Sequence, residues 1–84
     1  MDRFVWNRPV SLEMYGRGHY RVVSSAKDAG RVLRNEWPRF VGRNYDVALQ
    51  MCNAALKEDA DPEQARLAFL AAAREADIPV IGDT

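Results

Sequence analysis

The sequence predicts a single α+β domain in which an N-terminal β-hairpin packs on three α-helices. Residues up to about 24 alternate polar and apolar side chains with the period of a strand. From residue 25 onward, apolar side chains recur at helical spacing in three segments, which proline, glycine and polar clusters separate. A chain of 84 residues is expected to form one domain, residues 1–84, with a small core, because so short a chain buries only about 60–65% of its unfolded surface.

The β-hairpin is expected over about residues 4–24. Apolar side chains at even positions from Phe4 to Met14 indicate a strand with one buried face. The two glycines of "YGRGHY" permit the positive φ of a turn, after which "YRVVS" resumes the alternation in the same phase, with Tyr20 and Val22 on the buried side. Pro9 lacks a backbone N–H, so its strand is either an edge strand or two short pieces bent at residues 7–9.

The first helix is expected over about residues 26–37. Ser25 and Asp28 resemble a capping box in which aspartate replaces the usual glutamate or glutamine. Trp37 is expected to be the last core residue of this helix. Pro38 ends the helix, because a residue that precedes proline is pushed out of the α region.

The second and third helices are expected over about residues 43–57 and 62–76. The apolar arc of the second helix covers roughly 220°, so this helix needs neighbours on two sides. The third helix has the clearest start in the chain, with Asp61 at the N-cap and Pro62 in the first turn. Residues 77–84 form a tail that either docks on the hairpin edge as a short extended segment or hangs free.

Charge divides the chain into two unequal halves although the formal net charge is zero. Residues 1–43 carry nine basic and four acidic side chains, and residues 44–84 carry three and eight, so the halves stand at +5 and −5. The residues that could bind an anion or a nucleic acid are Arg17, Arg21, Lys27, Arg31, Arg34, Arg39 and Arg43. We prefer the simpler interpretation that they form a solvated face or pair with the acidic half.

The residue types present argue against catalysis and metal binding. With one histidine and one cysteine, the chain has no ligand spacing of a metal site. Cys52 falls at the centre of an apolar helix face, where a cysteine acts as a small hydrophobe with a raised pKa. His19 follows the turn glycines and is expected to be exposed. We therefore expect no catalytic residue, no metal and no cofactor, and a protein that is not an enzyme.

The sequence predicts neither a membrane-spanning helix nor a signal peptide. No apolar run approaches the roughly 20 residues of a membrane-spanning helix. The stretch "MDRFVWNRPV" has no continuous apolar segment typical of a signal peptide. A lone cysteine is consistent with a reducing compartment. A cytoplasmic location without membrane association is the expectation.

Four stretches, taken together, resemble a known family. They are "RPV" near the start, "VVSSAKDAGRVL" leading into "EWP", "YDVALQMCNAAL", and "DPEQARLAFLAAAREADI". In this combination the chain is similar to domain of unknown function 982, a family of small bacterial proteins, from about Pro9 to Ile78. The resemblance implies a ββααα domain and imports no activity. Asp77 stands where the family often has glycine, which implies a less favourable helix C-cap.

The leading hypothesis is a non-catalytic protein-interaction module that binds an unknown protein partner or a second copy of itself. Apolar side chains in excess of what the contact between the second and third helices uses are Val47, Met51, Ala54, Leu67 and Leu70. They either face the hairpin as part of the core or lie exposed as an interface. The alternative hypothesis is a nucleic-acid-binding accessory protein that uses the arginine-rich surface of the N-terminal half.

Overall fold

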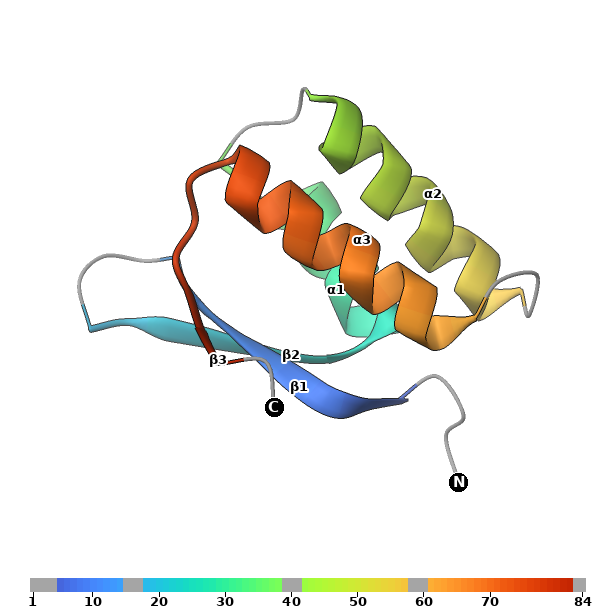
Figure 1. The fold of residues 1–84 in the computed structure, drawn as a ribbon, viewed down its shortest axis with the longest axis horizontal. Coiled ribbons are helices and arrows are strands. Elements are labelled where there is room, and N and C mark those ends of the chain that lie inside the picture. The colour runs from blue at the N-terminus through green and yellow to red at the C-terminus, as the bar shows by residue number, and fades with distance from the viewer. Residues whose placement is uncertain (1–4, 15–17, 39–41, 58–60, 83–84) are drawn as a thin grey trace.

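Two strands, three helices and a short final strand follow one another along the chain (Figure 1). The computed structural model describes residues 5–14, 18–38, 42–57 and 61–82. The elements are β1 (Val5–Glu13), β2 (Tyr20–Ser25), α1 (Ala26–Asn35), α2 (Arg43–Leu56), α3 (Pro62–Glu75) and β3 (Val80–Gly82). The predicted α+β class and the ββααα order are confirmed, and the expected tail docks on the sheet as β3.

The three strands form an antiparallel sheet in the order β2-β1-β3. Because β1 is the central strand, the alternative that placed Pro9 in an edge strand is wrong. β3 pairs with β1 only at Ser11 and Leu12, beyond the proline. Pairing with β2 is irregular between Val5 and Val10. Val5 pairs with Ser25 and Val10 pairs with Val23, so β1 advances five residues where β2 advances two. The bent-strand alternative accounts for Pro9, because the missing N–H falls within this irregular segment.

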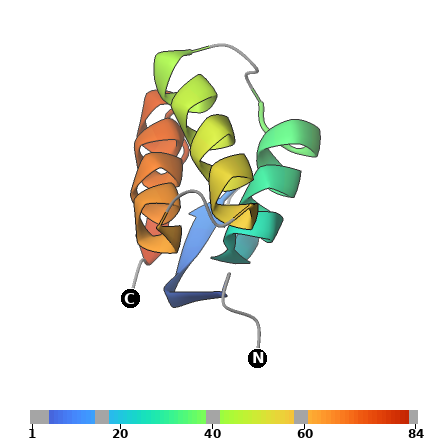
Figure 2. The ribbon, with the colours of Figure 1, turned by 90° about the vertical axis from the view of Figure 1, so that its right-hand side faces the viewer.

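The helices cover one face of the sheet in two tiers. α1 contacts β2 and α3 contacts β1, while α2 packs on both α1 and α3 (Figures 1 and 2). Phe69 of α3 is fully buried, and its ring centroid lies 5.8 Å from that of Trp6 and 5.4 Å from that of Trp37. These tilted aromatic contacts join the strand, the end of α1 and the third helix in one core.

The start of α1 agrees with its expected cap, and its end does not. The Ser25 hydroxyl accepts a hydrogen bond of 3.1 Å from the Asp28 N–H. The helix stops at Asn35, two residues before the expected end. Trp37 is buried just beyond the helix, because the residue before Pro38 favours extended backbone.

α2 and α3 begin differently. At α3, the Asp61 carboxylate accepts a hydrogen bond of 2.9 Å from the Glu63 N–H, and Pro62 occupies the first helical position. At α2 the N-cap is Gly42, with φ of 140° and no side chain to contribute. The Glu75 carboxylate, from the end of α3, instead accepts hydrogen bonds from the N–H groups of Asn44 (3.1 Å) and Tyr45 (3.0 Å).

The end of α3 places Asp77 in the conformation that glycine favours. Asp77 has φ of 58°. The Ile78 N–H donates to the Ala73 carbonyl at 2.9 Å, and the Asp77 N–H donates to the Arg74 carbonyl at 3.1 Å. This is the Schellman pattern of helix termination, so the aspartate stands where a left-handed residue is required.

Candidate functional site

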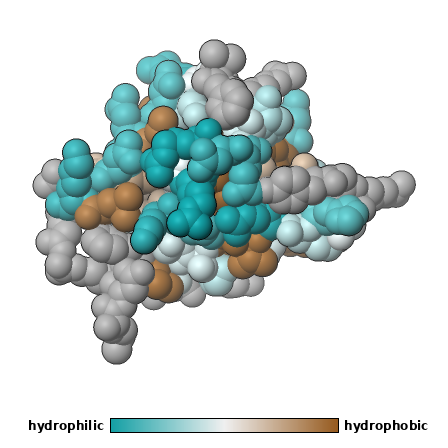
Figure 3. Space-filling model, turned by 180° about the vertical axis from the view of Figure 1, so that it is seen from behind, coloured by the Kyte–Doolittle hydropathy of each residue, from teal (hydrophilic) through white to brown (hydrophobic). Residues whose placement is uncertain are grey.

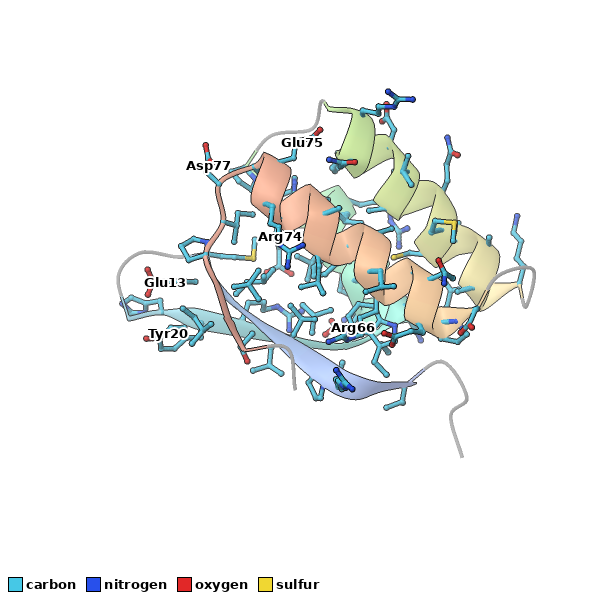
Figure 4. The ribbon with its side chains drawn as sticks, viewed as in Figure 1. Glu13, Tyr20, Arg66, Arg74, Glu75 and Asp77 are labelled. Carbon is cyan, nitrogen blue, oxygen red and sulfur yellow. The ribbon has the colours of Figure 1, made fainter. Side chains whose placement is uncertain are left out.

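Among the described residues, no element covers the sheet face opposite the helices, and apolar side chains of β2 lie on it. On β1, Val10 and Leu12 point into the core, so Ser11 and Glu13 point away from the helices. Val22 pairs with Ser11, and Tyr20 pairs with Glu13, at the end of the sheet labelled in Figure 4. Val22 and Tyr20 therefore share this outer face.

Among the described residues, exposed large hydrophobic side chains are more frequent on the strands than on the helices. Of the six exposed large hydrophobic residues in the part of the chain that the structure describes, four belong to strands. Their exposed fractions are 51% for Val5, 54% for Tyr20, 52% for Val22 and 55% for Ile81. We call Tyr20 and Val22, with Ser11 beside Val22 on β1, the open sheet face.

The sequence prediction assigned Tyr20 and Val22 to the buried side, and this is wrong. The register pairs Val10 with Val23 and Leu12 with Arg21, so even positions of β1 lie opposite odd positions of β2. Val23 is buried and Val22 is exposed as a result. A shift of one residue in pairing moves a whole strand face from core to solvent, and alternation within the strand does not fix that shift.

The five residues expected at an α2–α3 interaction surface divide between core and solvent. Leu70 is only 3% exposed and belongs to the core, which corrects its place among interface residues. Val47 and Leu67 are 43% and 47% exposed. Met51 and Ala54 are half-buried. The α2–α3 surface therefore consists of Val47 and Leu67 flanked by Met51 and Ala54.

Arg21 departs from the predicted anion-binding surface. Its guanidinium lies 2.9 Å from an Asp28 carboxylate oxygen and 3.4 Å from a Glu36 carboxylate oxygen, and Nη1 donates to the Val22 carbonyl at 3.0 Å. Its partners belong to its own half of the chain, so the expected pairing with the acidic half does not describe it. The side chain fixes β2 to α1.

The other basic candidates lie in several places. Arg17 and Arg39 lie outside the described residues. Arg43 is exposed at the start of α2, and Lys27, Arg31 and Arg34 are exposed on α1. α1 lies behind α3 in Figure 1, and the view from behind shows hydrophilic side chains across the middle of that face (Figure 3).

Cys52 is buried, and its thiol is a poor nucleophile. Burial raises the pKa of its thiol to about 12, against a smaller lowering by the charge of Arg34. A thiol with such a pKa carries no thiolate at neutral pH. His19 is exposed in the segment before β2. Among the described residues, no three His, Cys, Asp or Glu side chains converge as metal ligands.

Sequence reasoning missed two contacts that hold the fold together. Arg66 of α3 is 2% exposed, and its Nε donates to the Arg8 carbonyl at 2.9 Å in the irregular segment of β1. Its Nη1 donates to the Glu63 carboxylate at 3.1 Å. Glu75, which caps α2, was the other. The spacing of Glu63 and Arg66 signals an ion pair, but neither long-range contact has a local signal.

No helix within the described part of the chain has both the length and the apolar character needed to cross a membrane.

Comparisons with known proteins agree with the resemblance in the sequence. The model of the family described as "Protein of unknown function (DUF982)" matches residues 8–80. The NMR structure of Agrobacterium tumefaciens protein Atu1219, a structural genomics target, is similar with 34% sequence identity and a TM-score of 0.73. That match covers 90% of this chain and 75% of the other. No curated protein matches. The chain belongs to the DUF982 family of proteins of unknown function.

Proposed function

We propose that this domain is a non-catalytic protein-interaction module in which two copies associate through their open sheet faces. The observation that carries the proposal is the exposure of Tyr20 and Val22 on a sheet face that none of the described helices covers. Antiparallel sheets usually keep one face polar when that face meets solvent. Apolar and aromatic side chains on such a face are typical of a contact surface.

A second copy fits this face because sheets pack on one another. Two sheets stack about 10 Å apart when their facing side chains interdigitate. A twofold axis through the face places the same side chains of both copies in one contact, so no further complementary surface is needed. The hydroxyl of Tyr20 and the carboxylate of Glu13 lie at the rim, where polar groups stay in water.

The size of the face determines the strength expected of the contact. Three strands about 4.8 Å apart span roughly 14 Å, and β2 is six residues long while β3 has only three, so the face measures at most about 14 by 20 Å, or about 300 Å² per copy. Stable complexes bury about 1,200–2,000 Å² in total, and this contact would bury about half of the lower figure. We therefore expect weak, reversible association, with Kd on the order of 100 μM to 1 mM.

Sedimentation equilibrium and light scattering over a concentration series up to about 1 mM test the proposal. Val22→Lys and Val47→Lys are matched variants, because both place one lysine at a half-exposed valine, the first on the sheet and the second on α2. We expect the first variant to be monomeric throughout and the second to associate as the parent does. A parent that is monomeric at the highest concentration overturns the proposal. Loss of association only in Val47→Lys would assign the contact to the α2–α3 surface instead.

A further inference from the structure

Three basic side chains line the solvent side of α1. Lys27, Arg31 and Arg34 are separated by four and three residues, which places them on one side of the helix. All three are exposed. From first to last they span seven residues, or about 10.5 Å along the helix axis. We call them the basic stripe.

The acidic groups of α1 do not neutralise this stripe. Asp28 in the first turn and Glu36 at the C-cap both pair with Arg21 of β2. Among the described residues, no carboxylate lies within ion-pair distance of a side chain of the stripe. Arg21 thus pairs with both of these carboxylates, and the three basic side chains of the stripe are exposed to solvent.

Arg34 is also held in place by its surroundings. Its Nη1 donates to the Asn53 side chain of α2 at 3.4 Å. The guanidinium lies over Gly30, where a Cβ atom would stand 3.2 Å from Nη1. The glycine therefore leaves room for the guanidinium between α1 and α2. A cation that is already ordered loses less conformational entropy when it binds an anion.

We propose that the basic stripe binds the phosphodiester backbone of a nucleic acid strand without reading its bases. A row of separate, unneutralised cations suits a row of phosphates, and arginine offers planar, bidentate donors to phosphate oxygens. α1 contains no aromatic side chain on which a base could stack. Contacts to phosphate alone carry no sequence information, so binding is independent of sequence. The proposal concerns a different element from the open sheet face and does not depend on self-association.

The expected affinity is low and strongly salt-dependent. Three phosphate contacts to a single strand predict a slope of about −2 for log K against log salt concentration. At physiological salt we expect Kd of about 10⁻⁴ M or weaker, the weak end of non-specific binding.

Fluorescence anisotropy with labelled single-stranded DNA and RNA oligonucleotides, in a salt series that starts at about 20 mM, tests the stripe. Arg31→Gln and Arg74→Gln are matched, since each removes one charge from an exposed arginine, on α1 and on α3 respectively. We expect Arg31→Gln to weaken binding about fivefold or more at low salt and to reduce the slope by about 0.7, and Arg74→Gln to change affinity less than twofold. Melting temperatures confirm that both variants fold.

DNA and RNA are expected to bind alike, because the contacts go to phosphates. Absence of binding to either at the lowest salt overturns the proposal. Equal weakening by Arg31→Gln and Arg74→Gln also overturns it, since binding would then follow net charge. Competition by polyglutamate as effective as competition by unlabelled oligonucleotide does the same, because it would show attraction to any polyanion.

Discussion

α2 and α3 are both 14 residues long, and their N-termini are capped in opposite ways. α3 carries its own cap, because Asp61 and Pro62 directly precede or begin the helix. α2 takes its cap from Glu75, which lies more than 30 residues later at the far end of α3. The first kind of cap depends on sequence neighbours and forms with the helix. The second depends on tertiary structure and forms only when the two helices are packed.

The cap of α2 requires two residues at once. Gly42 has φ of 140°, a conformation that costs a residue with a side chain about 1–3 kcal/mol. A Cβ atom at this position would also overlap the Glu75 carboxylate. The glycine therefore permits both the backbone turn and the approach of the carboxylate to the first N–H groups of the helix.

Gly42→Ala is expected to have the largest effect. It adds backbone strain and displaces the Glu75 carboxylate, so we expect a loss of about 3 kcal/mol of unfolding free energy. Urea denaturation followed by circular dichroism measures the loss. The double variant Gly42→Ala with Glu75→Ala should lose less unfolding free energy than the sum of the losses in the two single variants, because each single variant already removes the same cap. Full additivity would contradict the shared role of the two residues.

Glu75→Ala is expected to destabilise more than Asp61→Ala. Glu75 accepts two backbone hydrogen bonds and joins two helices, so its loss should cost about 1.5–2 kcal/mol. Asp61 accepts one such bond at an exposed site, and its loss should cost about 1 kcal/mol. The same urea titrations measure both. If the two costs are equal, or their order is reversed, the cap that Glu75 supplies to α2 contributes no more stability than the cap that Asp61 supplies to α3.

Asp77→Gly is expected to have the smallest effect and the opposite sign. The residue already has the φ of 58° that glycine adopts without strain, and a carboxylate near a helix C-terminus opposes the helix dipole. We expect a gain of about 0.5–1 kcal/mol in unfolding free energy, which appears as a rise in the midpoint of thermal unfolding. Asp77→Ala removes the charge and keeps the strain, so it separates the two contributions. A glycine variant no more stable than the alanine variant would assign the whole gain to charge.

The same distinction explains how far the sequence predicts this protein. Ser25, Asp61 and Pro62 are local signals, and α1 and α3 begin at the positions that these residues predict. The orientation of β2 depends on its register with β1, and the central place of β1 depends on a strand at the other end of the chain. The alternation of polar and apolar residues within one strand predicts neither the register of β2 nor the central place of β1.

The candidate surfaces follow the same rule. Lys27, Arg31 and Arg34 were among the basic candidates of the sequence, and their exposure follows locally, because the apolar side of α1 fixes its solvent side. Exposure of Val22, burial of Leu70 and the pairing of Arg21 with two carboxylates depend on which elements meet. Composition could not show them, since the same residues are compatible with either side of the core.

The central position of β1 also bears on the order of events during synthesis. β2 follows β1 within a few residues, but Val80, the partner of Leu12 on the other side, comes 68 residues later (80 − 12). As the ribosome releases the chain, β1 can form a hairpin early and then keeps one unpaired backbone edge while all three helices emerge. Such edges are where nascent chains pair wrongly with one another. When the three-residue β3 pairs with β1, it covers backbone groups of that edge that another nascent chain could otherwise bind.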